Sequence, residues 1–365
     1  MPIFMDVHNA PGVKALDVAV AHHKDFLHQD EFGCKCMTYW MDEIRGNVFC
    51  LIEAPTKESV EELHRKSHGL VPHKVIEVNS DIVASFLGRI YDPENATITE
   101  DGLKVFHDTS FRILLVTRTI DPVLLQYKYG RDMAHELLNG QHVIIRKQLA
   151  VHSGRETEHA GQGFIISFSS AAQAVSCALA IQKEIPAGHV VQTGFRIGIH
   201  AGDPVSKTDQ LFGDTIHLAN YLCMVNGNSC ITISSVVKEL ISSAYFESGP
   251  HFLALSPSDE AALELLYKKL ESSWQDADFN MSDYCQTMAM SQSQLYRKSV
   301  ALTGLSPNIL LKEFRLGKAK ELMKKLRYNV SEIAFESGFT SPSYFTKCFK
   351  KKYGLLPMDY LDLLQ

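Results

Sequence analysis

Residues 333–357 read IAFESGFTSPSYFTKCFKKKYGLLP, and this stretch decides the fold of the C-terminal part of the chain. Ala334 is small enough to let two helices cross closely. Gly338 can adopt the left-handed conformation that ends a first helix. Ser341 is a favoured N-cap residue and Pro342 suits the first helical position, so a second helix begins there. The stretch therefore predicts two helices joined by a tight turn.

The second predicted helix has one apolar face and one polar face. Phe345, Cys348 and Phe349 recur at helical spacing and form the expected buried stripe. The opposite face carries hydroxyl and amine groups, which is typical of a helix that reads base edges in the DNA major groove. The residues that we expect to face DNA are Ser341, Ser343, Thr346, Lys347 and Lys350.

An upstream stretch, residues 281–307 (MSDYCQTMAMSQSQLYRKSVALTGLSP), repeats this plan. Tyr284, Cys285 and Met288 form the expected inner stripe of its first helix. Gln pairs well with adenine edges and Arg with guanine edges, and each pair is worth roughly 1–3 kcal/mol of discrimination. The expected DNA-facing residues of this copy are Ser291, Gln292, Gln294, Arg297 and Lys298.

A third helix is predicted between the two copies, over residues 309–326. Its apolar stripe consists of Leu310, Phe314, Leu322, Met323 and Leu326. A helix of about 18 residues spans about 27 Å, and successive major-groove faces lie about 34 Å apart. One connecting helix can therefore hold two DNA-reading helices near one turn apart on the same side of a duplex.

The charge of the chain is unevenly distributed. The whole chain has a net charge of -6, whereas residues 291–352 contain thirteen Lys or Arg and four Glu and carry +9. A basic segment on an acidic body favours contact with a polyanion. A solvated helical face is the alternative explanation, and charge alone does not exclude it.

The pattern I-A-x-x-S-G-F-x-S-x-S-Y-F-x-x-x-F-K-K-x-x-G-x-x-P of residues 333–357 resembles the AraC/XylS signature. The resemblance implies two helix-turn-helix units that bind one asymmetric site on double-stranded DNA and regulate nearby promoters. The first unit departs from the family, because Cys285 stands where Ala is usual and Ala289 where Gly is frequent.

The middle of the chain, residues 110–255, alternates predicted strands and helices. The expected strands are 112–117, 163–168, 195–200 and 230–234, and the expected helices are 171–184 and 236–241. Four phrases, AGQGFIISFSSAAQAVSCALAIQ, FRIGIHAGDPV, LFGDTIHLANYL and CITISSVVKEL, together resemble the class III nucleotidyl cyclase domain. The resemblance implies a cyclase-like α/β sandwich that pairs with a second copy.

Cyclase chemistry needs two divalent metals on two carboxylates. In the resemblance, Thr117 and Gln162 stand at the metal positions, and His217 and Tyr221 stand where the family uses Asn and Arg. Asp121 lies close enough to the first strand to restore only one ligand. We therefore expect no catalytic residues, and a module kept for dimerisation or for sensing a small molecule. An active cyclase fused to a DNA-binding domain is the alternative.

The N-terminal residues predict strands 3–8, 36–42, 47–53 and 74–78 and helices 13–32 and 57–68. This βαββαβ order is ferredoxin-like. Leu16, Val20 and Phe26 are expected on the inner face of the first helix.

Histidines are concentrated in this part of the chain. His64 and His68 are four residues apart, so one helix face can present both imidazoles to a metal. Asp6, Cys50 and Glu53 can add ligands from neighbouring strands. Such a pair also arises by chance, and from the residues alone we favour that explanation.

The phrases MPIFMDVHNAPGV, AHHKDF, YWMDEIRGNVFCLIEAP and HRKSHGL resemble a small domain of nickel-binding bacterial proteins. The resemblance implies binding of Ni²⁺ or a related divalent metal without a catalytic role. The candidate ligands are His8, His22, His64 and His68, since imidazole suits Ni²⁺.

These segments predict a multidomain α+β protein. The expected parts are a ferredoxin-like domain (1–80), a linker (81–109), a cyclase-like domain (110–255), a second linker (256–276) and an all-α tandem helix-turn-helix domain (277–365). With no signal peptide and no apolar run of bilayer length, we expect a cytoplasmic protein without membrane contact. We expect a homodimeric transcription regulator with a metal or small-molecule effector. A nickel-buffering protein is a further alternative.

Overall fold

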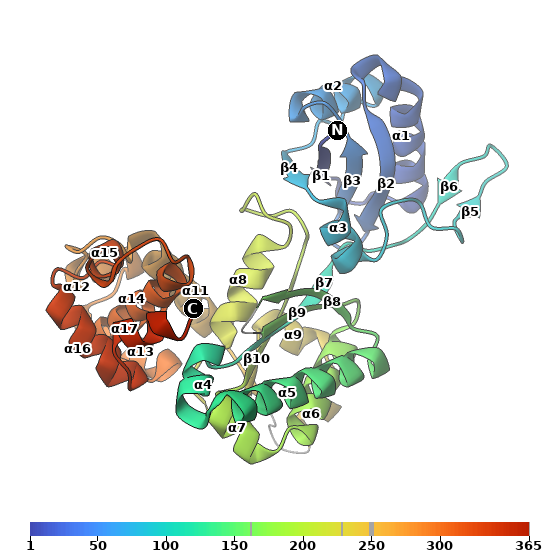
Figure 1. Cartoon of the computed structure of the whole chain (residues 1–365). Coiled ribbons are helices and arrows are strands. Elements are labelled where there is room, and N and C mark those ends of the chain that lie inside the picture. The colour runs from blue at the N-terminus through green and yellow to red at the C-terminus, as the bar shows by residue number, and fades with distance from the viewer. Residues whose placement is uncertain (161–162, 228, 248–251, 365) are drawn as a thin grey trace.

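The computed structural model describes residues 1–160, 163–227, 229–247 and 252–364. Figure 1 shows an N-terminal body in blue, a middle body in green and yellow, and a C-terminal body in red. Sheets occur in the first two bodies, and the described residues of the third are helical. In the part of the chain that the structure describes, no helix combines the length and the apolar character needed to cross a bilayer.

The N-terminal body is a four-stranded antiparallel sheet with helices packed on it. Its elements follow the predicted order: β1 (Ile3–Asn9), α1 (Ala15–His28), η1 (Gln29–Phe32), β2 (Lys35–Asp42), β3 (Asn47–Glu53), α2 (Lys57–Ser67) and β4 (Lys74–Val78). The strands lie in the order β2-β3-β1-β4, so β1 is central. Both faces of the sheet are covered, which explains why the strands read as nearly continuous apolar runs.

The segment predicted as the first linker contains folded structure. It includes α3 (Ser80–Leu87) and a short hairpin of β5 (Thr97–Ile98) and β6 (Lys104–Val105). Phe86 and Leu87 of α3 are buried between the N-terminal sheet and the middle body.

Successive residues of β1 point to opposite faces of the sheet. Phe4 packs in the cluster formed with α1 and α2, whereas Met5 packs with Phe86 of α3. Asp6 and His8, which share the face of Phe4, are therefore directed toward α1 and α2.

The buried face of α1 differs from the predicted one. Leu16, Val20 and Phe26 are 52%, 37% and 54% exposed, so their predicted place inside is wrong. The small side chains of Ala15 and Ala19 let the other face of α1 approach the sheet closely. The carboxylate of Asp25 on that face contacts His64 and His68. The buried residues of α1 are Ala15, Val18, Ala19 and Asp25.

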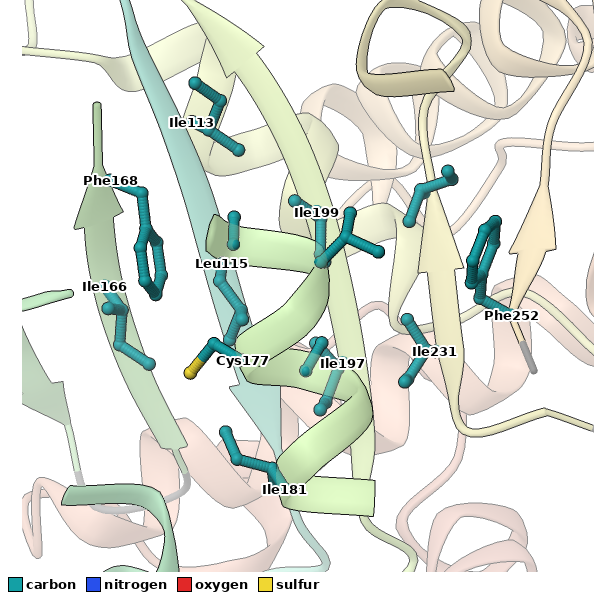
Figure 2. Packing of buried hydrophobic residues seen from close by; sticks show 14 of the residues in the cluster. Ile113, Leu115, Ile166, Phe168, Cys177, Ile181, Ile197, Ile199, Ile231 and Phe252 are labelled. Carbon is teal, nitrogen blue, oxygen red and sulfur yellow. The ribbon is translucent and has the colours of Figure 1, made fainter. Parts of the chain in front are cut away.

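The middle body contains a six-stranded sheet in the order β12-β11-β10-β7-β9-β8. Its elements are β7 (Arg112–Arg118), α4 (Pro122–Tyr129), α5 (Arg131–Val151), β8 (Arg155–Ala160), β9 (Gly163–Phe168), α6 (Ala171–Glu184), α7 (Ala187–Thr193), β10 (Arg196–Gly202), α8 (Gly213–Leu222), β11 (Ile231–Ile233), α9 (Ser235–Leu240), α10 (Ala244–Glu247) and β12 (Leu253–Ala254). Figure 2 shows α6, with Cys177 and Ile181, in front of the strands that carry Leu115 (β7) and Ile197 (β10), so α6 buries its apolar face on the sheet.

The C-terminal body begins with a helix where the second linker was predicted. Its elements are α11 (Pro257–Ser273), α12 (Met281–Met288), α13 (Gln292–Thr303), α14 (Pro307–Lys324), α15 (Val330–Glu336), α16 (Pro342–Tyr353) and α17 (Pro357–Asp362). Leu263, Leu266 and Leu270 of α11 are fully buried, at 0% exposure. They pack in one cluster with Leu222 of α8 and Leu295 of α13, so α11 joins the middle body to the first helix-turn-helix unit.

The connecting helix α14 is 18 residues long, as predicted. Leu310 and Met323 are buried. Leu326 is 55% exposed and has a φ of 50°, so its predicted place in the stripe is wrong. The reason is that α14 ends at Lys324, before Leu326 can continue the helical face.

Candidate DNA interface and candidate metal centre

The turn of the second helix-turn-helix unit has the predicted geometry. Gly338 has a φ of 78°, and a Cβ at this position would lie 2.3 Å from the backbone oxygen of Trp274, so only glycine fits. Ser341 caps α16 by accepting a hydrogen bond from the backbone N–H of Tyr344 at 3.3 Å. Pro342 occupies the first turn. This turn fixes the direction of α16.

The two units present cations from equivalent points. Counted from the N-cap serine of each helix, Arg297 of α13 and Lys347 of α16 occupy the same position, and both are exposed. Leu295 and Phe345 also occupy one equivalent position, and both are 0% exposed. The repeat in sequence is therefore a repeat in structure.

The predicted DNA-facing residues of α16 form a polar outer face. Ser343, Lys347 and Lys350 are exposed, whereas Ser341 and Thr346 are half-buried. Among the residues that the structure describes, the ammonium groups of Lys347 and Lys350 have no hydrogen-bond or ion-pair partner. Such cations are available to DNA phosphates.

The predicted residues of α13 divide into two groups. Ser291, Gln292, Gln294 and Arg297 are exposed. The Oε1 atom of Gln294 accepts a hydrogen bond from the backbone N–H of Ser291 at 2.9 Å and so closes the capping box.

Lys298 is directed away from this exposed group. Its ammonium lies 2.6 Å from Oδ1 of Asp259 in α11. The hydrogen bond from Lys298 lowers the pKa of Asp259. The equivalent position in α16 is the buried Cys348, so Lys298 lies on the inner side of α13 and holds it on α11.

The sequence reasoning missed two exposed tyrosines. Tyr296 of α13 and Tyr344 of α16 are 55% and 52% exposed. A phenol hydroxyl can donate to a phosphate or a base edge. Comparison of the two copies would have found Tyr296, because it stands at the position of Thr346.

Three of the four predicted metal-binding histidines lie together. The ring centroids of His8 and His64 are 4.7 Å apart, and those of His64 and His68 are 5.1 Å apart. Asp6 of β1 joins them, because its Oδ2 lies 2.8 Å from Nε2 of His64. Asp6 and His64 are 0% exposed and His8 is 7% exposed. The group is therefore enclosed between β1 and α2.

Asp25 of α1 extends this group. Its Oδ1 lies 3.3 Å from Nδ1 of His64 and 3.3 Å from Nε2 of His68. Two overlapping sets of ligand atoms, each within 4.8 Å of one another, are formed by Asp6, His8, Cys50 and His64 and by Asp25, His64 and His68.

Sequence reasoning missed Asp25, although it follows His22 by one helical turn. His22 itself is in neither set of ligand atoms, and its ring packs against Tyr39 with 5.2 Å between centroids. Glu53, which the sequence suggested as a further ligand, pairs with the N-terminal amine at 3.4 Å.

Electrostatics within the cluster favour charged carboxylates. Burial would raise the pKa of Asp6, but His64 and His8 outweigh it and hold that pKa well below its usual value. Burial would lower the pKa of His64, but Asp6 and Asp25 outweigh it and raise that pKa to about 10. Against the effect of burial, His64 and His68 lower the pKa of Asp25 to about 2. Positive charge at this point is therefore strongly stabilised.

The residues present fit a divalent cation. His8 Nε2 and Asp25 Oδ1 are buried and make no hydrogen bond among the described residues, although His8 Nε2 lies 3.3 Å from Oδ1 of Asp6 and Asp25 Oδ1 lies near the two histidine nitrogens named above. Buried polar atoms normally have partners, and buried charges are paired or coordinate metals. Imidazole nitrogens suit Ni²⁺ and Zn²⁺, and carboxylates can complete such a site.

The middle body carries neutral or aromatic groups at the described cyclase positions. The Oγ1 atom of Thr117 accepts a hydrogen bond from the backbone N–H of Phe164 at 2.9 Å. The Tyr221 hydroxyl donates to Glu271 at 2.7 Å, and His217 lies beside Tyr221. Gln162 lies outside the described residues.

Asp121, the carboxylate closest to the predicted cyclase site in sequence, has other partners. It caps α4 by accepting a hydrogen bond from the backbone N–H of Val123 at 3.0 Å. Its Oδ2 lies 2.8 Å from the ammonium of Lys324. These contacts engage Asp121 between α4 and α14.

Comparison with known families matches both ends of the chain. Residues 284–362 match the family described as a helix-turn-helix domain. Residues 4–78 match the family described as nickel responsive protein SCO4226-like.

The chain is similar to curated proteins over a part of its length. It is 33% identical over 111 residues to histidine kinase P4 of Formosa agariphila, and 34% identical over 105 residues to the transcriptional activator RhaR of Yersinia pseudotuberculosis. These matches cover 30% and 28% of this chain, but the chain spans only 8% and 35% of those proteins.

Solved structures are similar to parts of the chain. The C-terminal domain of the response regulator yesN from Fusobacterium nucleatum is 30% identical, with 28% of this chain and 98% of that chain covered and a TM-score of 0.27. SCO4226 from Streptomyces coelicolor is 28% identical, with 21% and 94% covered and a TM-score of 0.20. A bacterial light-regulated adenylyl cyclase is 12% identical, with 66% and 87% covered and a TM-score of 0.31.

The paired helix-turn-helix units and the family match define the C-terminal body as a helix-turn-helix DNA-binding domain. Within that class the domain is of the AraC type, in agreement with the signature of residues 333–357. The N-terminal body is an SCO4226-like domain.

Proposed function

We propose that this chain is a sequence-specific transcription regulator that reads double-stranded DNA with α13 and α16. The observation that carries the proposal is the exposure of Arg297 and Lys347 at equivalent positions of two helices joined by α14. The length of α14, about 27 Å, suits two helices near one turn of DNA apart. The proposed contacts are Ser291, Gln292, Gln294 and Arg297 on α13 and Ser341, Ser343, Thr346, Lys347 and Lys350 on α16. Lys298 contributes by holding α13 on α11.

The test is selection of bound duplexes from a random DNA library by the full chain. We expect one enriched asymmetric site with two parts about 10 base pairs apart. Binding to this site should exceed binding to heparin at moderate salt, because base contacts add to phosphate contacts. No enrichment would refute the proposal.

We also propose that the N-terminal domain, with a ferredoxin-like fold, binds Ni²⁺ or a related divalent metal. The support is the enclosed donor set, in which His8, His64 and His68 would ligate together with Asp6 or Asp25. His22 lies beside this set, so its role would be to support the site through the packing of α1. Bound metal would compensate the buried carboxylates and order the contact between β1, α1 and α2.

Calorimetric titration of the full chain with Ni²⁺ tests the metal proposal. We expect stoichiometric binding that is lost in His64→Ala. Measurement of DNA affinity with and without Ni²⁺ separates two functions: a change in affinity indicates a metal-responsive regulator, whereas stoichiometric binding without a change indicates metal buffering.

We also propose that the middle domain is a cyclase-like α/β module that has no cyclase activity and that serves dimerisation or the sensing of a small molecule. The support is that Thr117 offers no carboxylate for a metal and that His217 and Tyr221 stand where the cyclase family uses Asn and Arg. Incubation with ATP or GTP and Mn²⁺ should form no cyclic nucleotide above background. Light scattering should show a homodimer, and a monomer would refute that part.

A further inference from the structure

A cavity of about 600 Å³ lies between the middle body and the C-terminal body. β7, β10 and α8 form one wall, and α11, α14 and the end of α16 form the other. Cavities of this size take small organic molecules. Neither the proposed DNA contacts nor the metal cluster uses it.

Two arginines face each other at the wall formed by the middle body. Arg118 of β7 and Arg196 of β10 are direct partners across the two antiparallel strands, and both line the cavity. Like charges directly opposite one another destabilise a sheet. Arg196 donates to the backbone oxygen of Ser229 at 2.8 Å. The guanidinium group of Arg118 is half-buried and has no hydrogen-bond or ion-pair partner among the described residues.

Among the described residues, neither arginine forms an ion pair with an acidic residue of the cavity, and each of these acidic residues has another contact. These contacts are Glu271 with the Tyr221 hydroxyl at 2.7 Å, Glu313 with Lys352 at 3.1 Å, and Glu321 with Lys318 at 3.0 Å. A tyrosine hydroxyl does not neutralise Glu271, so the cavity holds one carboxylate and one guanidinium, that of Arg118, that are not ion-paired with each other. The two opposed arginines still offer a site for a ligand carboxylate, because guanidinium groups bind carboxylates in a bidentate manner.

Other parts of the cavity are apolar. Leu310 and Phe314 come from α14, and Met224 and Val225 follow α8. A ligand that fills this space must therefore combine one anionic group with an apolar body. A highly charged polyanion would meet the acidic side chains on the C-terminal wall.

We infer that this cavity binds a small organic carboxylate, with its carboxylate between Arg118 and Arg196 and its apolar body against Leu310 and Phe314. Such a ligand touches both bodies, so it stabilises their docked arrangement. Arg297 and Lys347 remain exposed in that arrangement, and the ligand therefore raises DNA affinity. The regulatory part rests on the proposed DNA-binding function, whereas the ligand site does not.

To test this inference, the full chain is titrated with benzoate and with octanoate at millimolar concentrations in the absence of DNA. Calorimetry measures the heat of binding, and thermal denaturation measures the Tm. Benzyl alcohol and octanol are the neutral controls for the apolar bodies. Arg118→Gln removes the proposed contact, and Arg131→Gln, an exposed arginine of α5, is the matched control variant.

We expect at least one carboxylate to raise Tm while its alcohol does not. In Arg118→Gln the affinity for the carboxylate should fall by at least about tenfold, which corresponds to a loss of about 1.4 kcal/mol of binding free energy. The same variant without ligand should keep or raise its Tm, since the opposed charges are relieved. A structural role for Arg118 would lower that Tm instead.

Three outcomes would overturn the inference: equal responses to carboxylates and alcohols, undiminished binding in Arg118→Gln, or binding of ATP with none of the carboxylates. The regulatory part is tested separately on the selected duplex. Carboxylate binding without a rise in DNA affinity overturns that part alone, and absence of DNA binding under all conditions refutes the proposed function while leaving the ligand site intact.

Discussion

The hydroxyl of Tyr360 donates a hydrogen bond to Oδ2 of Asp121 over 2.9 Å, although the two residues are 239 positions apart in the chain. The same carboxylate oxygen lies 2.8 Å from the ammonium of Lys324 and 3.3 Å from that of Lys320. Asp121 caps α4 in the middle body, whereas its three partners lie on α14 and α17. One carboxylate thus docks the second helix-turn-helix unit on the middle body.

Asp121→Asn should loosen this docking. Asparagine keeps the N-cap of α4, but it leaves the ammonium of Lys320, whose side chain is 12% exposed, without its counter-charge. We expect a loss of about 2–3 kcal/mol in the free energy of unfolding, measured by urea denaturation. Asp132→Asn, an exposed carboxylate of α5, is the control and should change the value by less than about 0.5 kcal/mol. Equal stability of the two variants would contradict the role of Asp121.

Acid should weaken the same contact. Burial would raise the pKa of Asp121, but Lys320 and Lys324 outweigh it and lower that pKa. A depressed pKa in the folded state means that this stabilisation is complete above the ordinary carboxyl pKa, about 4, and is lost as the pH falls through the lower folded value. The difference in stability between the wild-type chain and Asp121→Asn should therefore shrink only below about pH 4. A difference that already disappears near neutral pH would argue against this assignment.

Ala289→Gly should stabilise the first unit. Ala289 ends α12 with a φ of 50°, a left-handed conformation that costs a residue with a Cβ roughly 1–2 kcal/mol. Because glycine loses more entropy on folding, we expect a net gain of about 0.5–1 kcal/mol, measured as a shift in the urea midpoint. Ala301→Gly, in an exposed position within α13, should lose about 0.5–1 kcal/mol. A loss of stability in both variants would show that strain at Ala289 is absent.

The cations of the two units should contribute differently to DNA binding. Lys347→Ala and Lys350→Ala should weaken binding to all duplexes and each reduce the salt slope by about 1, because fewer counterions are released. Arg297→Ala should also relax base preference, at a cost of about 1–3 kcal/mol on the selected site.

Lys298→Ala is the matched comparison for these variants. Since Lys298 is paired with Asp259, its removal should leave the salt slope unchanged and lower the stability of the first unit instead. Fluorescence anisotropy over a salt series measures the salt slope, and urea denaturation measures the stability. If the salt slope changed in Lys298→Ala and not in Lys347→Ala, Lys298 rather than Lys347 would be the phosphate contact.

Asp25→Asn should weaken Ni²⁺ binding by about tenfold to a hundredfold, because the carboxylate next to His64 and His68 would lose its charge. Calorimetry gives the affinity, and the Tm of the metal-free chain shows whether the variant is folded. Glu53→Gln is the control, since Glu53 pairs with the N-terminal amine. Equal affinities in both variants would exclude Asp25 as a ligand.

Local patterns in the sequence were sufficient for the helix-turn-helix units. Gly338, Ser341 and Pro342 act through backbone geometry within a few residues, and each lies where its local chemistry predicts. The strands and helices that were predicted in the N-terminal and middle bodies were found for the same reason, because strand and helix periods are local properties. Helices α4, α5, α7 and α8 and strand β8 were not predicted.

Errors arose where a distant element decided which face of a helix is buried. The apolar content of α1 favours Leu16 and Phe26 inside, but the sheet accepts the face with Asp25, whose carboxylate finds His64 and His68. Lys298 was predicted as a DNA contact from its charge, and the structure adds Asp259 of α11 at 2.6 Å from its ammonium, so we propose that it holds α13 on α11.

The sequence by itself determined the helix-turn-helix repeat and the order of the N-terminal elements, because these depend on neighbouring residues along the chain. Only the tertiary structure decided which polar groups meet across elements, namely Asp25 with the histidines, Asp121 with Tyr360 and Arg118 with Arg196. The physical reason is that charge compensation depends on distance in space, and distance in space depends on how separate elements pack.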